Sequence, residues 1–226
     1  LAGLLPDAPL HIHIAEQVKE VEDCISWSGS RPVQWLLDNA PVDRRWCLIH
    51  ATHMTSEEAR RMAQSGAVAG LCPITEANLG DGIFPALPFL GGHGAWGIGS
   101  DSNVLIGLPD ELRQFEYSQR LGQKARNVVA WPNASTARRL FDESIAGGAQ
   151  ALGGKGGLSA GLSADFVSLT PKDVDYADDR LLFAHGADID CVWVRGVKCV
   201  ANGRHGKSDE ITRRFRAVMG ALIEGL

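Results

Sequence analysis

Residues at the ends of apolar runs could carry out hydrolytic metal chemistry. His11 and His13 alternate along such a run, so in a strand their side chains would share one face. Glu16 follows three residues later, where a strand would give way to a loop or a helix. A metal-binding histidine beside a carboxylate that moves protons suits metal-dependent hydrolysis. A lone His-x-His pair is more often ordinary packing, but His50 and Asp101, at the ends of later apolar runs, favour a site.

Short strands that alternate with helices would have to position these residues. Thr55 or Ser56 is a predicted N-cap, with Glu58 placed for a capping box, and Pro109 suits the first turn of a helix. The apolar runs predict strands at residues 10–14, 46–50, 68–72 and 96–99. The helical spacing predicts helices at residues 31–39, 55–65, 109–121 and 135–152.

The repeat of a strand, a polar residue and a helix is typical of βα units on a parallel sheet. His13, His50, Thr75 and Asp101 all fall at or just after the carboxyl end of a predicted strand. That edge carries the active site in a (β/α)8 barrel, and a doubly wound sheet also binds ligands there. The glycine-rich residues 153–157 lack the spacing of a phosphate-binding loop and are predicted to form a turn.

The last third of the chain has a different pattern. Short β-rich runs at residues 165–169, 190–194 and 198–201 are separated by glycine-containing tight turns, and a final amphipathic helix is expected from residue 209 to about residue 222. We therefore predict an α/β protein in which residues 1–157 form half of a βα barrel. Residues 158–205 would form a small β layer, and residues 206–226 a C-terminal helix.

The composition is that of a soluble globular protein and excludes several classes of partner. Of the 226 residues, 45% are hydrophobic and 22% charged, and the net charge is −5. This balance argues against binding to nucleic acid or to an anionic membrane surface. No apolar run approaches the roughly 20 residues of a membrane span, and residues 1–5 are too short for a signal peptide. Five scattered cysteines without a C-x-x-C motif indicate a reducing cytoplasm.

The constellation resembles the deaminase branch of the amidohydrolase superfamily. His13-x-x-Glu16 resembles its fifth-strand motif, His50 its sixth-strand histidine, and Asp101 its eighth-strand aspartate. Residues 148–167 resemble the return of the chain into that branch's β-sandwich, and residues 192–205 resemble its closing strands. Pro73 ends the strand predicted at residues 68–72, and residues 72–82 resemble the loop after the seventh strand in the formimidoylglutamate deiminases of histidine breakdown. Residues 112–127 also resemble that group within the branch. Guanine and chlorinated-ring hydrolases typically have asparagine where Glu76 stands.

The resemblance also implies that part of the barrel lies outside this sequence. The family binds its metal with a further His-x-His pair from the first strand, well upstream of the fifth-strand motif. His11 and His13 are not that pair, because Glu16 and the spacing to His50 and Asp101 fit the fifth strand. We therefore expect the C-terminal half of a metallohydrolase barrel, strands five to eight, together with part of a β-sandwich. An N-terminal half of the same protein would be needed to complete it.

The resemblance implies a role for each candidate residue. His13 and Asp101 would bind one Zn²⁺, although histidine and carboxylate ligands also suit Fe²⁺. Asp101 would also accept a proton from the attacking water, and His50 would orient the resulting hydroxide. Glu16 would protonate the substrate nitrogen and then the leaving amine.

The implied substrate is a small amidine, N-formimino-L-glutamate, which would give N-formyl-L-glutamate and ammonia. Glu76 and Asn78 are candidate substrate-binding residues, with ordinary turn chemistry as the alternative. The resemblance also implies a homodimer. Two other functions stay open: a hydrolase of the same branch that acts on guanine, an adenosine derivative or a triazine, and a fragment that is inactive without the first-strand histidines.

Overall fold

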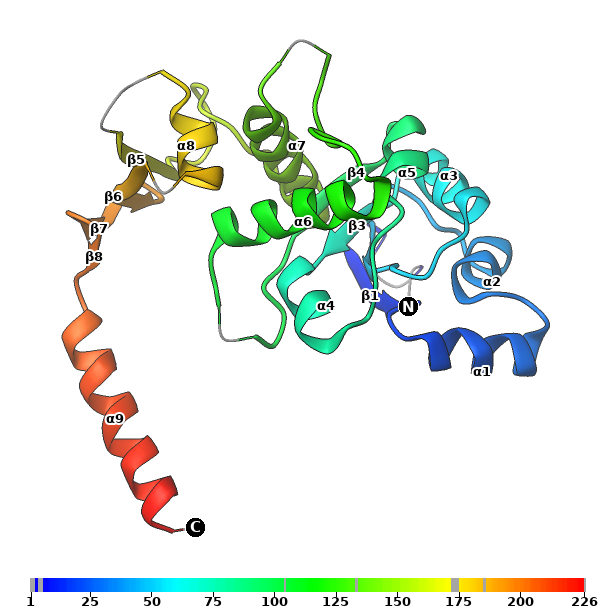
Figure 1. Cartoon of the computed structure of the whole chain (residues 1–226), viewed down its shortest axis with the longest axis horizontal. Coiled ribbons are helices and arrows are strands. Elements are labelled where there is room, and N and C mark those ends of the chain that lie inside the picture. Colours follow the sequence, from blue (N-terminus) through cyan, green and yellow to red (C-terminus); the bar gives the residue numbers. More distant parts are fainter. Residues whose placement is uncertain are drawn as a thin grey trace. The chain divides into compact units, whose positions relative to one another are not determined.

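The computed structural model describes residues 3, 6–103, 105–132, 134–171, 175–184 and 186–225. The chain divides into two units, Leu1–Gly157 and Leu158–Leu226 (Figure 1). The division falls at the end of the glycine-rich residues 153–157, which contain bends and turns, as predicted. Among the described residues, no helix combines the length and the apolar character needed to cross a membrane.

A parallel sheet of four strands forms the centre of the first unit. The strands are β1 (Leu10–Ile14), β2 (Trp46–His50), β3 (Val68–Leu71) and β4 (Ala95–Ile98), and they lie in the order β1-β2-β3-β4. A doubly wound sheet reverses its strand order part-way, whereas a βα barrel keeps neighbours in chain order. The sheet is therefore an arc of a barrel. Within the described part of the chain, β1 and β4 each pair on one side only.

The helices of the first unit follow the strands as the predicted repeat requires. They are α1 (Val18–Ser28), α2 (Pro32–Asn39), α3 (Ser56–Ser65), α4 (Pro73–Leu79), α5 (Ala86–Gly91), α6 (Leu108–Gln123) and α7 (Thr136–Ala151). The predictions for α2, α3, α6 and α7 are confirmed to within two residues at each end. We did not predict α1, α4 or α5.

The capping box of α3 is confirmed and extends beyond the helix itself. The Thr55 hydroxyl accepts a hydrogen bond from the Glu58 backbone N–H at 3.2 Å, and the Glu58 carboxylate accepts one from the Thr55 N–H at 2.8 Å. The same buried carboxylate accepts the Arg31 guanidinium Nε–H at 2.8 Å. The start of α3 is thus tied to the residue that precedes α2.

Helix α4 is the main correction to the predicted fold. We expected residues 72–82 to form a loop, because Pro73 ends the strand. Proline is also well suited to the first turn of a helix, and in this chain Pro73 opens α4. Gly80 ends the helix with a left-handed backbone, at φ 72°. Glu76 therefore lies on the buried first turn of a helix rather than in a loop.

Helix α7 approaches the sheet so closely that only glycine fits at the contact. It packs against β3 and β4, and a Cβ atom on Gly147 would lie 2.0 Å from the Trp96 carbonyl oxygen. Ala151, near its end, joins a buried cluster with Cys47 and Val68. These contacts fix α7 against β3 and β4.

The second unit contains an antiparallel sheet and two helices. Its strands are β5 (Phe166–Pro171), β6 (Ala187–Val194), β7 (Val197–Ala201) and β8 (Arg204–His205), in the order β5-β6-β7-β8. The predicted tight turns are confirmed: Arg195 with Gly196, and Asn202 with Gly203, all have positive φ, as type I′ hairpin turns require. Helix α8 (Ala177–Phe183) was not predicted, and α9 (Ser208–Glu224) was.

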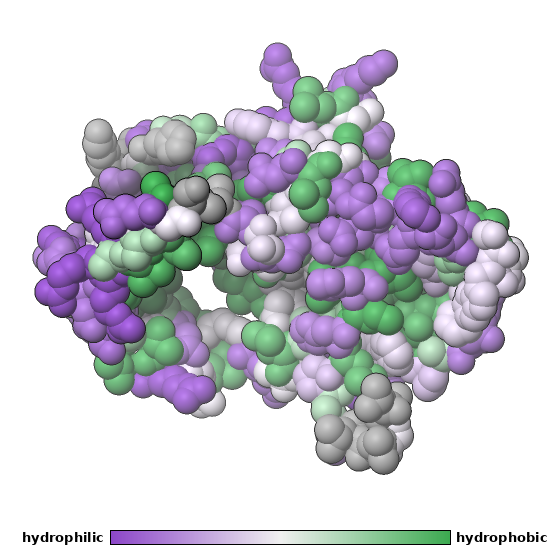
Figure 2. Space-filling model, turned by 90° about the horizontal axis from the view of Figure 1, so that it is seen from below, coloured by the Kyte–Doolittle hydropathy of each residue, from purple (hydrophilic) through white to green (hydrophobic). Residues whose placement is uncertain are grey.

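Apolar side chains reach the surface in several places, between polar ones (Figure 2). None of the described residues of α9 is buried. Its exposed apolar side chains recur at helical spacing: Ile211, Phe215, Val218, Met219, Leu222 and Ile223.

Candidate functional site

Three of the predicted site residues converge at the carboxyl edge of the parallel sheet. Glu16 lies just after β1, His50 ends β2, and Asp101 lies just after β4. His50 and Asp101 have left-handed backbones, with φ of 65° and 49°. Such values are uncommon outside glycine, and they turn these side chains over the end of the sheet.

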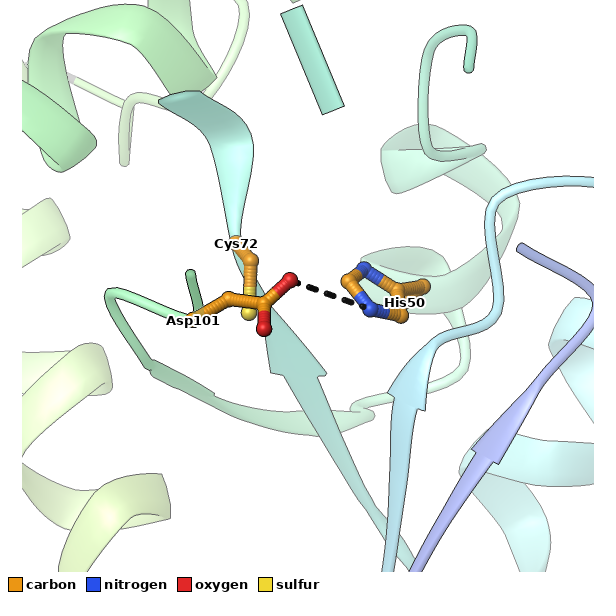
Figure 3. Close-up of side chains that lie close together, drawn as sticks. All are labelled: His50, Cys72 and Asp101. Atoms are coloured by element: carbon orange, nitrogen blue, oxygen red, sulfur yellow. Dashed lines mark ion pairs between the residues drawn. The ribbon is translucent and has the colours of Figure 1, made fainter. Parts of the chain in front are cut away.

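His50 is the centre of the cluster. Its side chain is 1% exposed. Its Nε2 atom lies 3.6 Å from a Glu16 carboxylate oxygen. The same atom lies 3.8 Å from an Asp101 carboxylate oxygen (Figure 3). On the other side of the ring, Nδ1 lies 3.3 Å from Glu76 Oε1. Nε2 has no hydrogen-bond partner among the described residues. Nδ1 of the ring is therefore paired with Glu76, whereas Nε2 is available to a ligand or to water.

The surroundings of His50 act on its pKa in opposite directions. Burial lowers the pKa, but the hydrogen bond to Glu76 and the charges of Glu16, Glu76 and Asp101 outweigh burial, so that the pKa is raised. The cluster of carboxylates thus favours a positive charge at this point.

Glu16 is aimed by a second carboxylate that the sequence did not identify. Ala15 has a left-handed backbone, at φ 51°. Glu20, in the first turn of α1, accepts the Ala15 N–H at 2.7 Å and the Glu16 N–H at 2.9 Å. These two bonds hold the unusual turn that carries Glu16. The signal in the sequence was an acidic residue four positions after Glu16.

His13 lies next to this cluster, as predicted. Its ring meets the His50 ring edge-on, with centroids 5.3 Å apart. His11 and His13 share one face, and both line a hollow of about 260 Å³ on the face of the sheet next to α7, together with Cys72 and Asp101. His11 Nε2 hydrogen-bonds the Ala151 carbonyl oxygen at 2.8 Å. Both histidines are exposed, and the hydrogen bond of His11 attaches its ring to the end of α7.

The donor set at this edge fits a divalent metal ion. Ligand atoms of His50, Cys72 and Asp101 all lie within 4.8 Å of one another (Figure 3). A buried nitrogen without a hydrogen-bond partner faces two carboxylates, an electron-rich arrangement that a cation would stabilise. Cys72 was not predicted, since nothing in its local sequence marks it. Burial, and then the nearby acidic groups, raise the pKa of its thiol to about 12.

Glu76 and Asn78 take different positions on α4. Glu76 is 5% exposed, and its Oε1 accepts the Cys72 backbone N–H at 3.1 Å in addition to facing His50. Asn78 is exposed. The structure does not bring these two residues together.

A buried network attaches the loop of Asp101 to α4. Glu111 accepts the Ile74 N–H at 2.8 Å, and the Asn103 amide donates to it at 3.3 Å. The Thr75 hydroxyl donates to the Ser100 carbonyl oxygen at 3.3 Å. Burial raises the pKa of Glu111 to about 7, against the lowering effect of its two hydrogen bonds. Thr75, predicted at this edge, is therefore a link within the scaffold.

Comparisons with known proteins agree with this geometry. The chain is 49% identical to formimidoylglutamate deiminase of Pseudomonas aeruginosa, over 99% of the chain and 52% of that protein. A crystal structure of an amidohydrolase from Brucella melitensis matches 98% of the chain and 51% of its own length, with 58% identity and a TM-score of 0.95. An adenosine deaminase from Xanthomonas campestris with bound zinc shares the fold, at 23% identity and a TM-score of 0.83 over 97% of the chain and 52% of its own length.

The matches also show how much of its relatives' length this chain covers. The chain spans about half the length of the relatives it matches, which agrees with the half barrel seen in the sheet order. The sequence profile described as the Amidohydrolase family matches residues 6–199. With its strand-end histidines and carboxylates in place, this chain belongs to the amidohydrolase family, and the curated relatives that it matches include a formimidoylglutamate deiminase and an 8-oxoguanine deaminase.

Proposed function

We propose that this chain supplies acid–base residues of a metal-dependent deiminase that converts N-formimino-L-glutamate and water to N-formyl-L-glutamate and ammonia. The observation that carries the proposal is the convergence of Glu16 and Asp101 on the free Nε2 of His50. The substrate is supported by the likeness to formimidoylglutamate deiminase.

The proposal includes a completed barrel. Strands β1 and β4 pair on one side only within the described part of the chain, and the relatives are about twice as long. An N-terminal half would pair with both edges and supply the first-strand histidines. For experiments we define the completed protein as this chain fused after the half of the Brucella melitensis amidohydrolase that it does not match.

We propose that His13 and Asp101, which line the same hollow, hold a zinc ion, and that His50 contacts the water rather than the metal. A bound zinc ion would lower the pKa of water toward neutrality. The free Nε2 of His50 lies on the same side as Asp101 and can hydrogen-bond the attacking water. Asp101 accepts a proton from that water. Glu16 protonates the imino nitrogen as the water oxygen bonds to the amidine carbon. It then takes the hydroxyl proton of the tetrahedral intermediate and passes it to the leaving amine, so that the carbon–nitrogen bond breaks, ammonia departs and the formyl carbonyl forms. The proton held by Asp101 returns to Glu16 through solvent and closes the cycle.

The first test is ammonia release by the zinc-loaded completed protein from N-formimino-L-glutamate and from guanine. Release from the first compound alone is expected. Release from guanine alone, or from neither compound while zinc is bound, would refute the proposed substrate. The 226-residue chain by itself should be inactive and should bind zinc weakly, because it lacks the first-strand pair.

The role of Glu16 can be tested separately from its contribution to folding. Removing a general acid lowers turnover by about 10²- to 10⁴-fold, so Glu16→Gln should lose activity within this range while zinc content stays unchanged. Glu22→Gln, on the exposed face of α1, is the matched control. Equal activity of the two variants would exclude Glu16 as the proton donor.

Three finer expectations accompany the proposal. The five cysteines are free thiols, which supports a reducing cytoplasm. We also propose a homodimer, which sedimentation of the completed protein would test. Asn78 remains a candidate contact to the substrate, since its side chain is exposed close to the end of α4.

A further inference from the structure

Glu76 stands directly behind His50, on the side away from the other carboxylates. The two side chains are 5% and 1% exposed. Glu76 Oε1 lies 3.3 Å from His50 Nδ1 and also accepts the Cys72 backbone N–H at 3.1 Å. One carboxylate oxygen therefore contacts both the ring and the backbone amide that precedes the helix.

This arrangement selects one tautomer of the neutral imidazole ring. A carboxylate oxygen that already accepts one N–H can only accept again, so the proton between Glu76 and His50 belongs to Nδ1. The other nitrogen, Nε2, then carries a lone pair. It faces Glu16 and Asp101 at 3.6 and 3.8 Å, without a hydrogen bond to any described residue.

We propose that Glu76 is a positioning residue that holds neutral His50 in the Nδ1–H tautomer and so keeps Nε2 open toward the reacting water. The proposal rests on the proposed function for the identity of that reaction. It replaces the substrate-binding role that we predicted for Glu76 from the sequence. A nearly buried carboxylate engaged with a ring and a backbone amide has little surface left for a ligand.

The opposite tautomer would damage the site in a specific way. With the proton on Nε2, the ring would donate to Glu16 or Asp101, both within reach of a small movement. The nitrogen that should accept a hydrogen bond from water would then be occupied. Loss of residues that orient catalytic or metal-binding histidines typically costs about 10- to 100-fold in activity or metal affinity.

The kinetic test is a double-mutant cycle in the zinc-loaded completed protein. Glu76→Leu should lower kcat by about 10- to 100-fold and leave KM nearly unchanged. In a His50→Asn background it should cost little more, because the ring it positions is gone. Glu76→Gln keeps an acceptor oxygen and should recover most of the turnover. Ala77→Ser, exposed on the same helix, is the control.

A rise in KM on Glu76→Leu that persists without His50 would mean that Glu76 contacts the substrate, and would overturn the proposal. The second readout is the tautomer itself, measured by ¹⁵N NMR of labelled histidine at a pH where the ring is neutral. The Nδ1–H form should dominate in the wild type and in Glu76→Gln, and the Nε2–H form in Glu76→Leu. A wild type in the Nε2–H form would also overturn it.

The NMR result needs no substrate, so it separates this proposal from the proposed function. If N-formimino-L-glutamate releases no ammonia, the tautomer measurement still decides the role of Glu76. If Glu76→Leu does not fold, Glu76→Gln remains decisive: a large loss of turnover with the Nδ1–H tautomer retained would refute the positioning role of Glu76.

Discussion

Replacing Glu111 by glutamine should remove a pH dependence of stability that is unusual in sign. Glu111 is 1% exposed, and its pKa rises from 4.5 to about 7, mainly because of burial. In the unfolded chain the carboxyl returns to its ordinary value. Between these two values the folded state binds more protons than the unfolded state, so stability falls as pH rises. Paired carboxylates usually act in the opposite direction.

The size of the effect follows from the two pKa values. The interval from 4.5 to about 7 corresponds to a full cost of about 3 kcal/mol once the folded group is ionised. Most of this change falls between about pH 5 and about pH 8. Over that range the unfolding free energy should therefore decrease by about 2 to 3 kcal/mol because of Glu111.

Urea unfolding of the metal-free 226-residue chain, followed by tryptophan fluorescence, measures this quantity. Trp96 is buried against Phe115, so its emission reports on the unit that contains Glu111. The difference in unfolding free energy between Glu111→Gln and the wild type should grow in favour of the variant as pH rises. Glu57→Gln, on an exposed side chain, should show no such trend. A constant difference between Glu111→Gln and the wild type would refute the reasoning.

Two further predictions concern the packing and the aim of the site. Gly147→Ala should destabilise the 226-residue chain by about 3 kcal/mol, the upper end for overpacking, because its Cβ would overlap the backbone oxygen of β4. Gly148→Ala, with open space around its Cβ, should instead stabilise the chain slightly. Equal shifts of the urea midpoint in the two variants would contradict a role for the contact between Gly147 and β4. Glu20→Ala should lower turnover of the completed protein on the order of 100-fold by releasing the turn that aims Glu16. Glu22→Ala is its control, and equal ammonia release by the two variants would contradict this role.

The sequence pattern predicted secondary structure correctly where a local signal marks a single strand or helix. β1 and β2 have the predicted bounds, and α3 has its predicted cap, because alternation and capping are local signals. The prediction of a loop at α4 was wrong because Pro73 was taken as a stop when it is also a good first residue of a helix. Helices α5 and α8 have six and seven residues, too few to establish a periodic pattern.

At the site, too, local sequence signals predicted some residues, whereas contacts between distant elements could not be predicted. Strand-end positions predicted that Glu16, His50 and Asp101 would meet, since parallel strands end on one edge. They could not predict which buried group would face the back of His50. Glu76 does so because the buried first turn of α4 packs against the end of β2, and this contact depends on tertiary packing. The involvement of Cys72 and Glu111 depends on the same packing.

The order of the four parallel strands has a consequence for how the protein folds. Each strand pairs with the next one along the chain, so these contacts close short loops and cost little chain entropy. In a completed barrel, β4 would also have to pair with the first strand of the N-terminal half, which would be the strand most distant from β4 in the sequence. That pairing would close the longest loop in the domain. We therefore expect the arc of β1 to β4 to form early, and the junction at β4 to set the folding rate.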